Sequence, residues 1–306
     1  MKKYMDIERL KEFKNDKNWN PTDIVVVQEK MDGSNASFQY DEASGELKAF
    51  SRRQELSPTN TLNGFYNWIK LNEKYIIVHL KAEFGEEDMG KYVFFGEWGV
   101  KNKVKYKEEY YGQFYFYDIY DISKGEYMYQ DIVKMVANEF GLNYVNTLYE
   151  GEFKSWDNMR QFMGKSNLAI AEGEGVVVKN QTLLNSPRDE FYLKLVCESF
   201  SEVMKVREPK AADPNEAPAR AIVDSIVTER RIEKMLCNLR DDGIITEPYD
   251  ASQMRVIAQN LPKRIWEDIN KEELEAVEEG LKLCDNFGKF CSSKTMELAR
   301  KVVLNG

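Results

Sequence analysis

Short apolar runs separated by turn residues dominate the first two thirds of the chain. Residues 24–27 are a continuous apolar run, which predicts a buried strand. Residues 36–40 alternate between apolar and polar side chains, a pattern typical of a half-buried strand. Because Asp32-Gly33 separates the two segments, the pattern predicts a β-hairpin with Lys30 near its tip.

The same pattern predicts further strands and helices before residue 205. Clusters of β-branched and aromatic residues predict strands at residues 47–52, 92–98, 114–119, 176–179 and 191–196. Apolar residues at helical spacing predict helices at 61–71, 129–140 and 156–163, and a short helical lead-in within residues 1–20.

The last third of the chain has a different character. Residues 205–219 are rich in Pro and Ala, which predicts a linker between a domain at 1–204 and another at 220–306. From residue 220 onward the apolar residues recur at helical spacing, so we expect the second domain to be all-α.

Composition narrows the classes of function. The single histidine, His79, excludes mechanisms that need two histidines, and the spacing of the four cysteines matches no zinc pattern. A net charge of -9 argues against a protein that coats nucleic acid electrostatically, although it leaves room for a local basic cleft. The chain has no apolar run of about 18 residues and no apolar signal region, so we expect no membrane partner and a cytoplasmic location.

Several charged residues at strand ends point to phosphoryl transfer. A solvated lysine beside a turn is the simpler interpretation of Lys30 alone, but a lysine amine in a cleft can also attack phosphorus. Glu97 and Glu174 each stand beside a glycine and carry the hard oxygen ligands that suit Mg²⁺. Lys194 lies between apolar strand residues, where it could neutralise a phosphate and lower the pKa of Lys30. An aromatic side chain from residues 114–117 could stack on a base.

A basic segment with an interleaved aromatic residue, Tyr106, lies at 101–107. Solvated loop charges explain it as well as contact with phosphate does, and the sequence leaves both interpretations open.

The ordered set of motifs resembles that of covalent nucleotidyltransferases. The motifs are Glu-Lys-Met-Asp-Gly (29–33), Ser-Arg-Arg (51–53), Phe-Gly-Glu-Trp (95–98), Phe-Tyr-Phe-Tyr-Asp-Ile (114–119), Glu-Gly-Val-Val-Val-Lys (174–179) and Leu-Lys-Leu-Val (193–196). Within that superfamily the chain most resembles ATP-dependent RNA ligases of the RNA ligase 2 type. Asn35, the Phe-Ser-Glu at 200–202 and the helical last third favour this branch. A weak Thr-x-x-Arg at Thr228 and Arg231 extends the resemblance.

The resemblance implies a fold and a chemistry. The expected fold is α+β, with an N-terminal nucleotidyltransferase domain of largely antiparallel sheets flanked by helices, followed by a small all-α domain that binds nucleic acid. The expected reaction transfers AMP from ATP to a lysine, then to a 5′-phosphate RNA end, and finally joins that end to a 3′-OH. A divalent cation, Mg²⁺ or Mn²⁺, is implied, and both suit oxygen ligands. The implied partner is RNA, as in a nicked duplex under repair, and we expect a monomer.

The family roles fall on individual residues of this chain. Lys30 would accept AMP, Glu29 would hold the adenine side of the pocket, and Asn35 would lie near the ribose or a phosphate. Arg52 would contact the nucleotide or the RNA end, with Arg53 as the alternative.

The remaining roles fall on the later motifs. Glu97 would contact the ribose or organise metal, and Glu174 would organise metal. Tyr117 would stack on adenine, where the family commonly has phenylalanine, and Lys194 would contact the α-phosphate.

Two positions depart from the family pattern. Val196 stands where this type has a second lysine, so we expect Lys179 to meet the leaving pyrophosphate in its place. Asp32 stands where this type often has histidine. Three alternatives remain: a DNA ligase, a capping-type guanylyltransferase, and a degenerate protein that only binds nucleotide or nucleic acid. The first two carry an OB-fold where this chain is helical.

Overall fold

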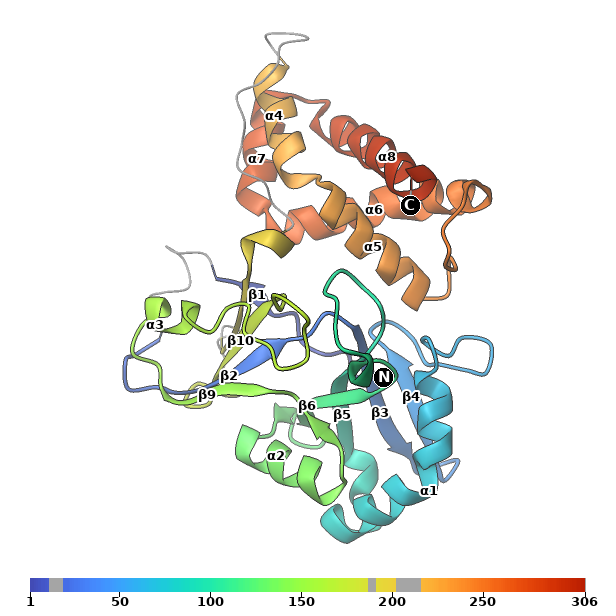
Figure 1. Cartoon of the computed structure of the whole chain (residues 1–306), viewed down its shortest axis with the longest axis vertical. Helices are drawn as coiled ribbons and strands as arrows, with labels where there is room; N and C mark the ends of the chain where they lie inside the picture. Colours follow the sequence, from blue (N-terminus) through green and yellow to red (C-terminus); the bar gives the residue numbers. More distant parts are fainter. Residues whose placement is uncertain (11–18, 187–190, 202–215, 306) are drawn as a thin grey trace. The chain divides into compact units, whose positions relative to one another are not determined.

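The computed structural model describes residues 1–10, 19–186, 191–201 and 216–305, which divide into two compact units. Unit 1 spans Met1–Ser199 and unit 2 spans Phe200–Gly306. Unit 1 contains sheets and helices, and unit 2 contains only helices among its described residues, so the expected α+β class is confirmed (Figure 1).

Two sheets form the framework of unit 1. The first sheet has the order β1 (Glu8–Arg9), β11 (Tyr192–Val196), β10 (Gly175–Asn180), β2 (Ile24–Lys30) and β9 (Thr147–Glu152). The second has the order β4 (Glu46–Ser51), β3 (Ser34–Asp41), β5 (Tyr92–Trp98), β6 (Phe114–Asp121) and β7 (Glu126–Tyr127), with β8 (Asn143–Tyr144) also paired to β6. The pairings are antiparallel except for β1–β11 and β6–β8.

The predicted hairpin around Asp32-Gly33 is wrong, although both of its strands are present. β2 pairs with β10 and β9 in the first sheet, whereas β3 pairs with β4 and β5 in the second. Residues 31–33 therefore carry the chain from one sheet to the other. A Cβ on Gly33 would lie 2.5 Å from the Trp98 carbonyl oxygen, so this crossing requires glycine.

Helices cover the outer faces of the sheets. α1 (Phe65–Phe84) and α2 (Gln130–Glu139) pack on one face of the second sheet, where Phe38, Phe94 and Phe116 lie in the largest core of unit 1 (Figure 1). α3 (Trp156–Arg160) packs with Trp19 and Phe153 against the apolar face of the first sheet. The described residues also contain the short 3₁₀ turns η2 (Met89–Lys91), η3 (Glu108–Tyr110) and η4 (Glu198–Phe200).

The opposite faces of the two sheets meet each other. Tyr4, Phe95 and Tyr192 belong to the apolar cluster between them. The layers of unit 1 are therefore, in order, α1 and α2, the second sheet, the first sheet and α3. One face of β2, β10 and β11 in the first sheet packs toward the second sheet. This arrangement brings the charged residues of different motifs into one region.

Unit 2 is a bundle around a single apolar core. Its elements are α4 (Ala217–Ile226), α5 (Glu229–Asp241), η5 (Ala251–Gln253), α6 (Met254–Glu272), α7 (Leu274–Leu283) and α8 (Phe287–Asn305). Thr228 caps α5, and the buried Arg231 guanidinium pairs with Asp268 and Glu273. The Thr-x-x-Arg motif therefore has a structural explanation within this unit.

Two predictions near element ends need correction, and a third lies mostly outside the described residues. Residues 1–10 contain β1 and no helix, and residues 11–18 of the predicted lead-in lie outside the described residues. The helix predicted at 61–71 begins at Phe65 and continues to Phe84, because apolar residues recur at helical spacing through Ile76 and Leu80. Most of the predicted linker at 205–219 lies outside the described residues, and α4 begins at Ala217.

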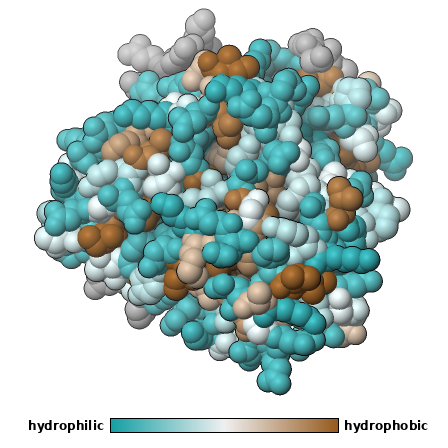
Figure 2. All heavy atoms as spheres, turned by 60° about the horizontal axis from the view of Figure 1, so that its bottom comes forward, coloured by the Kyte–Doolittle hydropathy of each residue, from teal (hydrophilic) through white to brown (hydrophobic). Residues whose placement is uncertain are grey.

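The surface is mainly hydrophilic on the face drawn in Figure 2, with hydrophobic side chains in several separate small groups. Singly exposed apolar residues are normal on a protein surface. No helix among the described residues is both long and apolar enough to cross a membrane.

Candidate active site

Lys30 is the last residue of β2 and faces a cluster of carboxylates. Its ammonium is ion-paired with the Glu174 carboxylate, and the two side chains are 25% and 15% exposed. The β2–β10 register places Lys30 opposite Gly175, directly after Glu174. A Cβ on Gly175 would lie 2.1 Å from the Leu195 carbonyl oxygen, so glycine is needed where β10 and β11 approach each other.

The charges around Lys30 set its protonation. Burial lowers the pKa of Lys30, but the carboxylates of Glu174, Asp32 and Glu97 outweigh burial and leave that pKa above its ordinary value. The lowered pKa that the sequence led us to expect for Lys30 is therefore not found in the protein alone. Lys30 is held as an ammonium ion.

Glu97 reaches the same region from the second sheet. The backbone N–H of Gly33 donates to Glu97 Oε1 at 3.1 Å. Burial raises the pKa of Glu97 to about 8, with Glu174 and Asp32 adding to the rise and Lys30 opposing it. The carboxylates of Glu97, Glu174 and Asp32 therefore carry more negative charge than the ammonium of Lys30 neutralises.

Glu97 and Glu174 are the residues expected to organise a metal ion. No cluster of three or more His, Cys, Asp and Glu side chains among the described residues is arranged as a metal site. Mg²⁺ in phosphoryl-transfer sites commonly uses one or two carboxylates together with substrate phosphates and water. The hard oxygen donors and the raised pKa of Glu97 therefore fit a cation that arrives with a phosphate ligand.

Asn35 and Tyr117 meet beside this cluster. Asn35 is the β3 partner of Glu97, and its Nδ2 donates to the Tyr117 hydroxyl. Burial raises the pKa of Tyr117 well above its ordinary value, and the charge of Arg52 opposes this, which places Arg52 nearby. The Arg52 guanidinium is paired with Asp6, and Arg53 is exposed beside it.

Glu29 lies on the other face of β2 and is 2% exposed. Its Oε2 accepts from Asn146 Nδ2 at 3.4 Å, while its buried Oε1 has no donor in hydrogen-bonding geometry. Burial raises the pKa of Glu29, against the opposing effect of Ser166 and Asn146. A buried acceptor without a donor is costly, and it fits a site that receives the amino group of a ligand.

Lys194 lies in β11 on the face of the first sheet that carries Lys30. The register aligns Lys194 with Val177 of β10, and Val177 with Gln28 of β2. Aligned residues share a face, and so do residues two apart along a strand. Lys194 and Lys30 are therefore on one face of the first sheet.

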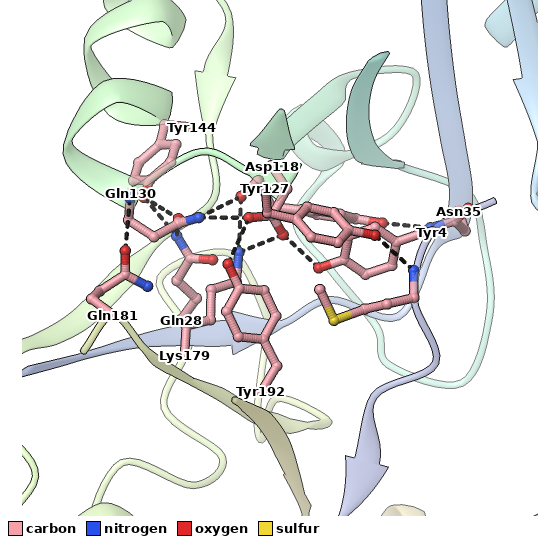
Figure 3. A network of polar contacts seen from close by, with 12 residues as sticks. Tyr4, Gln28, Asn35, Asp118, Tyr127, Gln130, Tyr144, Lys179, Gln181 and Tyr192 are labelled. Carbon is pink, nitrogen blue, oxygen red and sulfur yellow. Dashed lines mark hydrogen bonds and ion pairs between the residues drawn. The ribbon is translucent and has the colours of Figure 1, made fainter. Parts of the chain in front are cut away.

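Lys179 lies in a buried polar network instead of beside Lys30 (Figure 3). Its Nζ is 2.8 Å from Asp118 Oδ2 and donates to the Tyr117 carbonyl oxygen at 2.8 Å. Burial lowers the pKa of Lys179 against the effect of Asp118. Because the ammonium already has these partners, its placement argues against the predicted contact with pyrophosphate.

Asp118 is the centre of this network, and sequence reasoning missed its role. Tyr4, Gln130, Lys179 and Tyr192 converge on its carboxylate, which is completely buried (Figure 3). These four side chains come from both sides of the interface between the sheets. A signal was present, because a carboxylate within an aromatic strand needs a partner, and Lys179 is a lysine within another buried strand.

Asp32 is the second residue whose role the sequence did not reveal. Its Oδ2 accepts from the backbone N–H groups of Lys103 and Val104, each at 2.8 Å. Its own N–H donates to the Tyr106 hydroxyl at 2.9 Å. The residue next but one to Lys30 thus holds the basic segment in place.

Comparisons with known proteins show which family and which fold the chain resembles. A model of the RNA ligase family matches residues 23–196, more than half of the 306-residue chain. Among solved structures, an RNA ligase variant from Naegleria gruberi without ligand is 23% identical, with a TM-score of 0.50, and the match covers 65% of this chain and 57% of that chain. A variant of the same ligase with ATP and Mn is 21% identical, with a TM-score of 0.50 and coverage of 64% and 56%.

These structural matches establish likeness of fold, and the chain spans little more than half the length of the Naegleria chains. The comparison with curated proteins found no match.

Proposed function

The chain belongs to the RNA ligase family, and from that premise we propose that it is an ATP-dependent RNA ligase that works through a lysyl-AMP on Lys30. The observation that carries the proposal is the position of Lys30 at the end of β2, within a group of three carboxylates. An amine nucleophile surrounded by acidic oxygens suits a reaction in which metal-bound phosphate enters the site.

The proposed reaction has three phosphoryl transfers. In the first, the Lys30 amine attacks the α-phosphorus of ATP, forms the nitrogen–phosphorus bond and releases pyrophosphate. In the second, an oxygen of an RNA 5′-phosphate attacks the same phosphorus and releases the lysine. In the third, an RNA 3′-OH attacks the activated 5′-phosphate, forms a phosphodiester and releases AMP.

Glu97 and Glu174 would hold the divalent cation, Mg²⁺ or Mn²⁺, which supplies positive charge to the phosphates when bound. Glu174 also holds the proton of Lys30 in place through its ion pair, so the amine becomes nucleophilic only when that pairing weakens. Support for ATP and a metal comes from the Naegleria ligase variant, whose structure contains ATP and Mn.

The remaining residues would bind the nucleotide. Glu29 would take the adenine amino group on its unsatisfied Oε1. Tyr117 would offer its ring to the adenine, with its hydroxyl held by Asn35. Lys194 would contact the α-phosphate, and Arg52 the nucleotide or the RNA end.

Unit 1 is in this proposal the adenylyltransferase domain, and unit 2 is a domain that grips nucleic acid. The substrate would be RNA with 3′-OH and 5′-phosphate ends, of the kind found at a nick in a duplex, and the role would be RNA repair. An enzyme that consumes ATP and RNA ends would act inside the cell, and we propose that it does so as a monomer.

The test is covalent labelling with α-³²P-ATP and Mg²⁺, followed by a denaturing gel. We expect a labelled protein band that is lost in Lys30→Ala and retained in Lys74→Ala, which removes an exposed lysine of α1. A nicked RNA duplex should then be sealed faster than a nicked DNA duplex.

Other results would redirect the assignment. A band with labelled GTP instead of ATP would favour a guanylyltransferase. Folded protein that binds nucleotide but forms no band with either would refute covalent catalysis and leave a binding protein.

A further inference from the structure

Residues 101–107, called here the basic loop, connect β5 to η3 and present lysines to solvent at every second position. Lys101, Lys103, Lys105 and Lys107 are exposed. Val104 and Tyr106 between them are each 2% exposed. Because the chain as a whole has a net charge of -9, this row of positive charge is a local exception.

The basic loop is anchored to the segment that carries the nucleophile. Asp32 Oδ2 accepts from the N–H groups of Lys103 and Val104, each at 2.8 Å. Asn102 Nδ2 donates to the Gly33 carbonyl oxygen at 2.9 Å. Together with the Asp32 N–H that donates to the Tyr106 hydroxyl, these contacts tie the loop to the two residues that follow Met31, and so to the immediate neighbourhood of Lys30.

The other side of the basic loop is anchored to the segment before β10. Tyr106 forms a β-bridge with Ala169 and stacks on Tyr110 with ring centroids 3.8 Å apart. The Lys107 N–H donates to the Leu168 carbonyl oxygen at 2.9 Å, and the Ile170 N–H donates to the Lys105 carbonyl oxygen at 2.8 Å. The backbone of the loop is thus held on both sides, which fixes the positions from which the lysine side chains extend.

The charges of the neighbouring residues define the extent of the row. Glu108 and Glu109 follow in η3 and end it. Lys107 Nζ donates to the Asn167 carbonyl oxygen at 2.8 Å, and Lys101 Nζ lies 5.7 Å from the Tyr111 ring centroid. Neither contact pairs these two lysines with a carboxylate, so their charge remains available to an anion.

We propose that the basic loop holds the phosphodiester backbone of the polynucleotide substrate beside Lys30. This inference rests on the proposed ligase function. Lysine ammonium groups bind phosphates as point charges and carry no sequence information, which suits an enzyme that must accept ends of any sequence. An RNA backbone fits better than the leaving pyrophosphate, because a row of four exposed charges matches a polyanion running past the site.

The test uses two variants with equal change in net charge. The loop variant is Lys101→Gln, Lys103→Gln, Lys105→Gln and Lys107→Gln, which keeps Asp32, Asn102 and Tyr106. The control variant is Lys74→Gln, Lys81→Gln, Lys124→Gln and Lys134→Gln, at exposed lysines elsewhere on unit 1. Equal melting temperatures would show that both variants fold.

The probe is a nicked RNA duplex with a 5′-phosphate at the nick, bound without ATP at several salt concentrations. We expect the loop variant to bind at least about tenfold more weakly than the control variant at low salt. The slope of log affinity against log salt should fall by roughly 0.7 to 0.9 for each lysine that touches a phosphate. Formation of the lysyl-AMP without RNA should be unchanged.

Loop and control variants with the same affinity and the same salt slope would overturn the inference. Slower lysyl-AMP formation with unchanged RNA binding would also overturn it, because the lysines would then contact ATP. The binding measurement does not depend on adenylation. Suppose that the wild type forms no lysyl-AMP and that the loop variant binds RNA more weakly than the control variant. This result would refute the proposed function and would still support RNA binding by the basic loop.

Discussion

The ammonium of Lys30 is ion-paired with the carboxylate of Glu174, which directly precedes the β10 partner of Lys30. The two residues are 144 positions apart in the chain, and the antiparallel pairing of β2 with β10 brings them together. The pairing keeps the proposed nucleophile protonated in the protein alone. This relationship leads directly to the first prediction.

Glu174→Gln should make the amine of Lys30 more reactive. Glu174 is the largest of the carboxylate contributions that raise the pKa of Lys30, so its neutral isostere should lower that pKa and increase the fraction of free amine. We expect labelling of Lys30 by acetic anhydride at pH 8 to increase on the order of tenfold, as measured by mass spectrometry of the digested protein.

The matched control is Glu46→Gln, which removes a carboxylate from the ion pair with Lys70. Labelling of Lys30 should not change in this control. Equal labelling of Lys30 in Glu174→Gln and wild type would show that the ion pair does not govern its protonation.

Glu97→Gln should remove a pH-dependent loss of stability. Because the pKa of Glu97 in the folded protein is about 8, above its ordinary value of 4.5, the folded state binds more protons than the unfolded state between these values. The stability that this group contributes is complete at low pH and is lost as the pH rises toward 8. From pH 5 to pH 9, the free energy of unfolding of the variant should rise relative to that of wild type by about 2 kcal/mol, as measured by urea denaturation.

Parallel stability curves for Glu97→Gln and wild type across this pH range would contradict the assigned cause. Asp41→Asn is a suitable control, because the pKa of Asp41 is lowered by Ser44 and Lys48, and its effect falls at acidic pH.

A divalent cation should stabilise the wild type at pH 8 more than the Glu97→Gln variant. Positive charge bound by Glu97 and Glu174 would relieve the repulsion between these carboxylates. We expect the melting temperature of wild type to rise when Mg²⁺ or Mn²⁺ is added and to fall back to its starting value when EDTA is added. The rise should be smaller in Glu97→Gln. An equal response in both proteins would place the cation elsewhere.

Lys179→Met should strongly destabilise unit 1. Lys179 and Asp118 are 2% and 0% exposed, and removal of one partner from a buried ion pair costs about 3–5 kcal/mol. The double variant Asp118→Asn, Lys179→Met should recover part of this loss, because it removes the uncompensated charge. Both values are measured by urea denaturation.

Lys91→Met provides the comparison on the surface. Lys91 is paired with Asp88, and both side chains are about half exposed, so the loss should be much smaller than that for Lys179→Met. Losses of similar size for Lys179→Met and Lys91→Met would mean that the buried network does not join the two sheets energetically.

Gly33→Ala should destabilise the protein, whereas Gly288→Ala should stabilise it. A Cβ on Gly33 would lie 2.5 Å from the Trp98 carbonyl oxygen and 2.7 Å from the Tyr110 hydroxyl, so we expect a loss of about 1–3 kcal/mol. A Cβ on Gly288, near the start of α8, would lie 3.7 Å from Trp266, an ordinary contact, and alanine favours a helix over glycine, so we expect a small gain. Urea denaturation midpoints of Gly33→Ala and Gly288→Ala that shift in the same direction from wild type would contradict this interpretation.

The sequence by itself determined most of the longer strands and helices and named candidate residues for the proposed chemistry. Alternation and apolar runs are local properties, so residues 92–98 were predicted as a strand with the bounds that β5 has. Residue types that suit phosphoryl transfer, placed at predicted strand ends, also made Lys30, Glu97 and Glu174 candidates.

Only the tertiary structure decided which strands pair and which charges meet. The Asp-Gly at 32–33 has the local signature of a hairpin, yet β2 and β3 enter different sheets, because strand pairing depends on partners such as β10 and β5 that lie far away in sequence. The burial of Lys179 with Asp118, and the anchoring of the basic loop by Asp32, follow from that pairing. Local periodicity specifies the face on which a side chain lies, but the packing of one sheet on another specifies its partner.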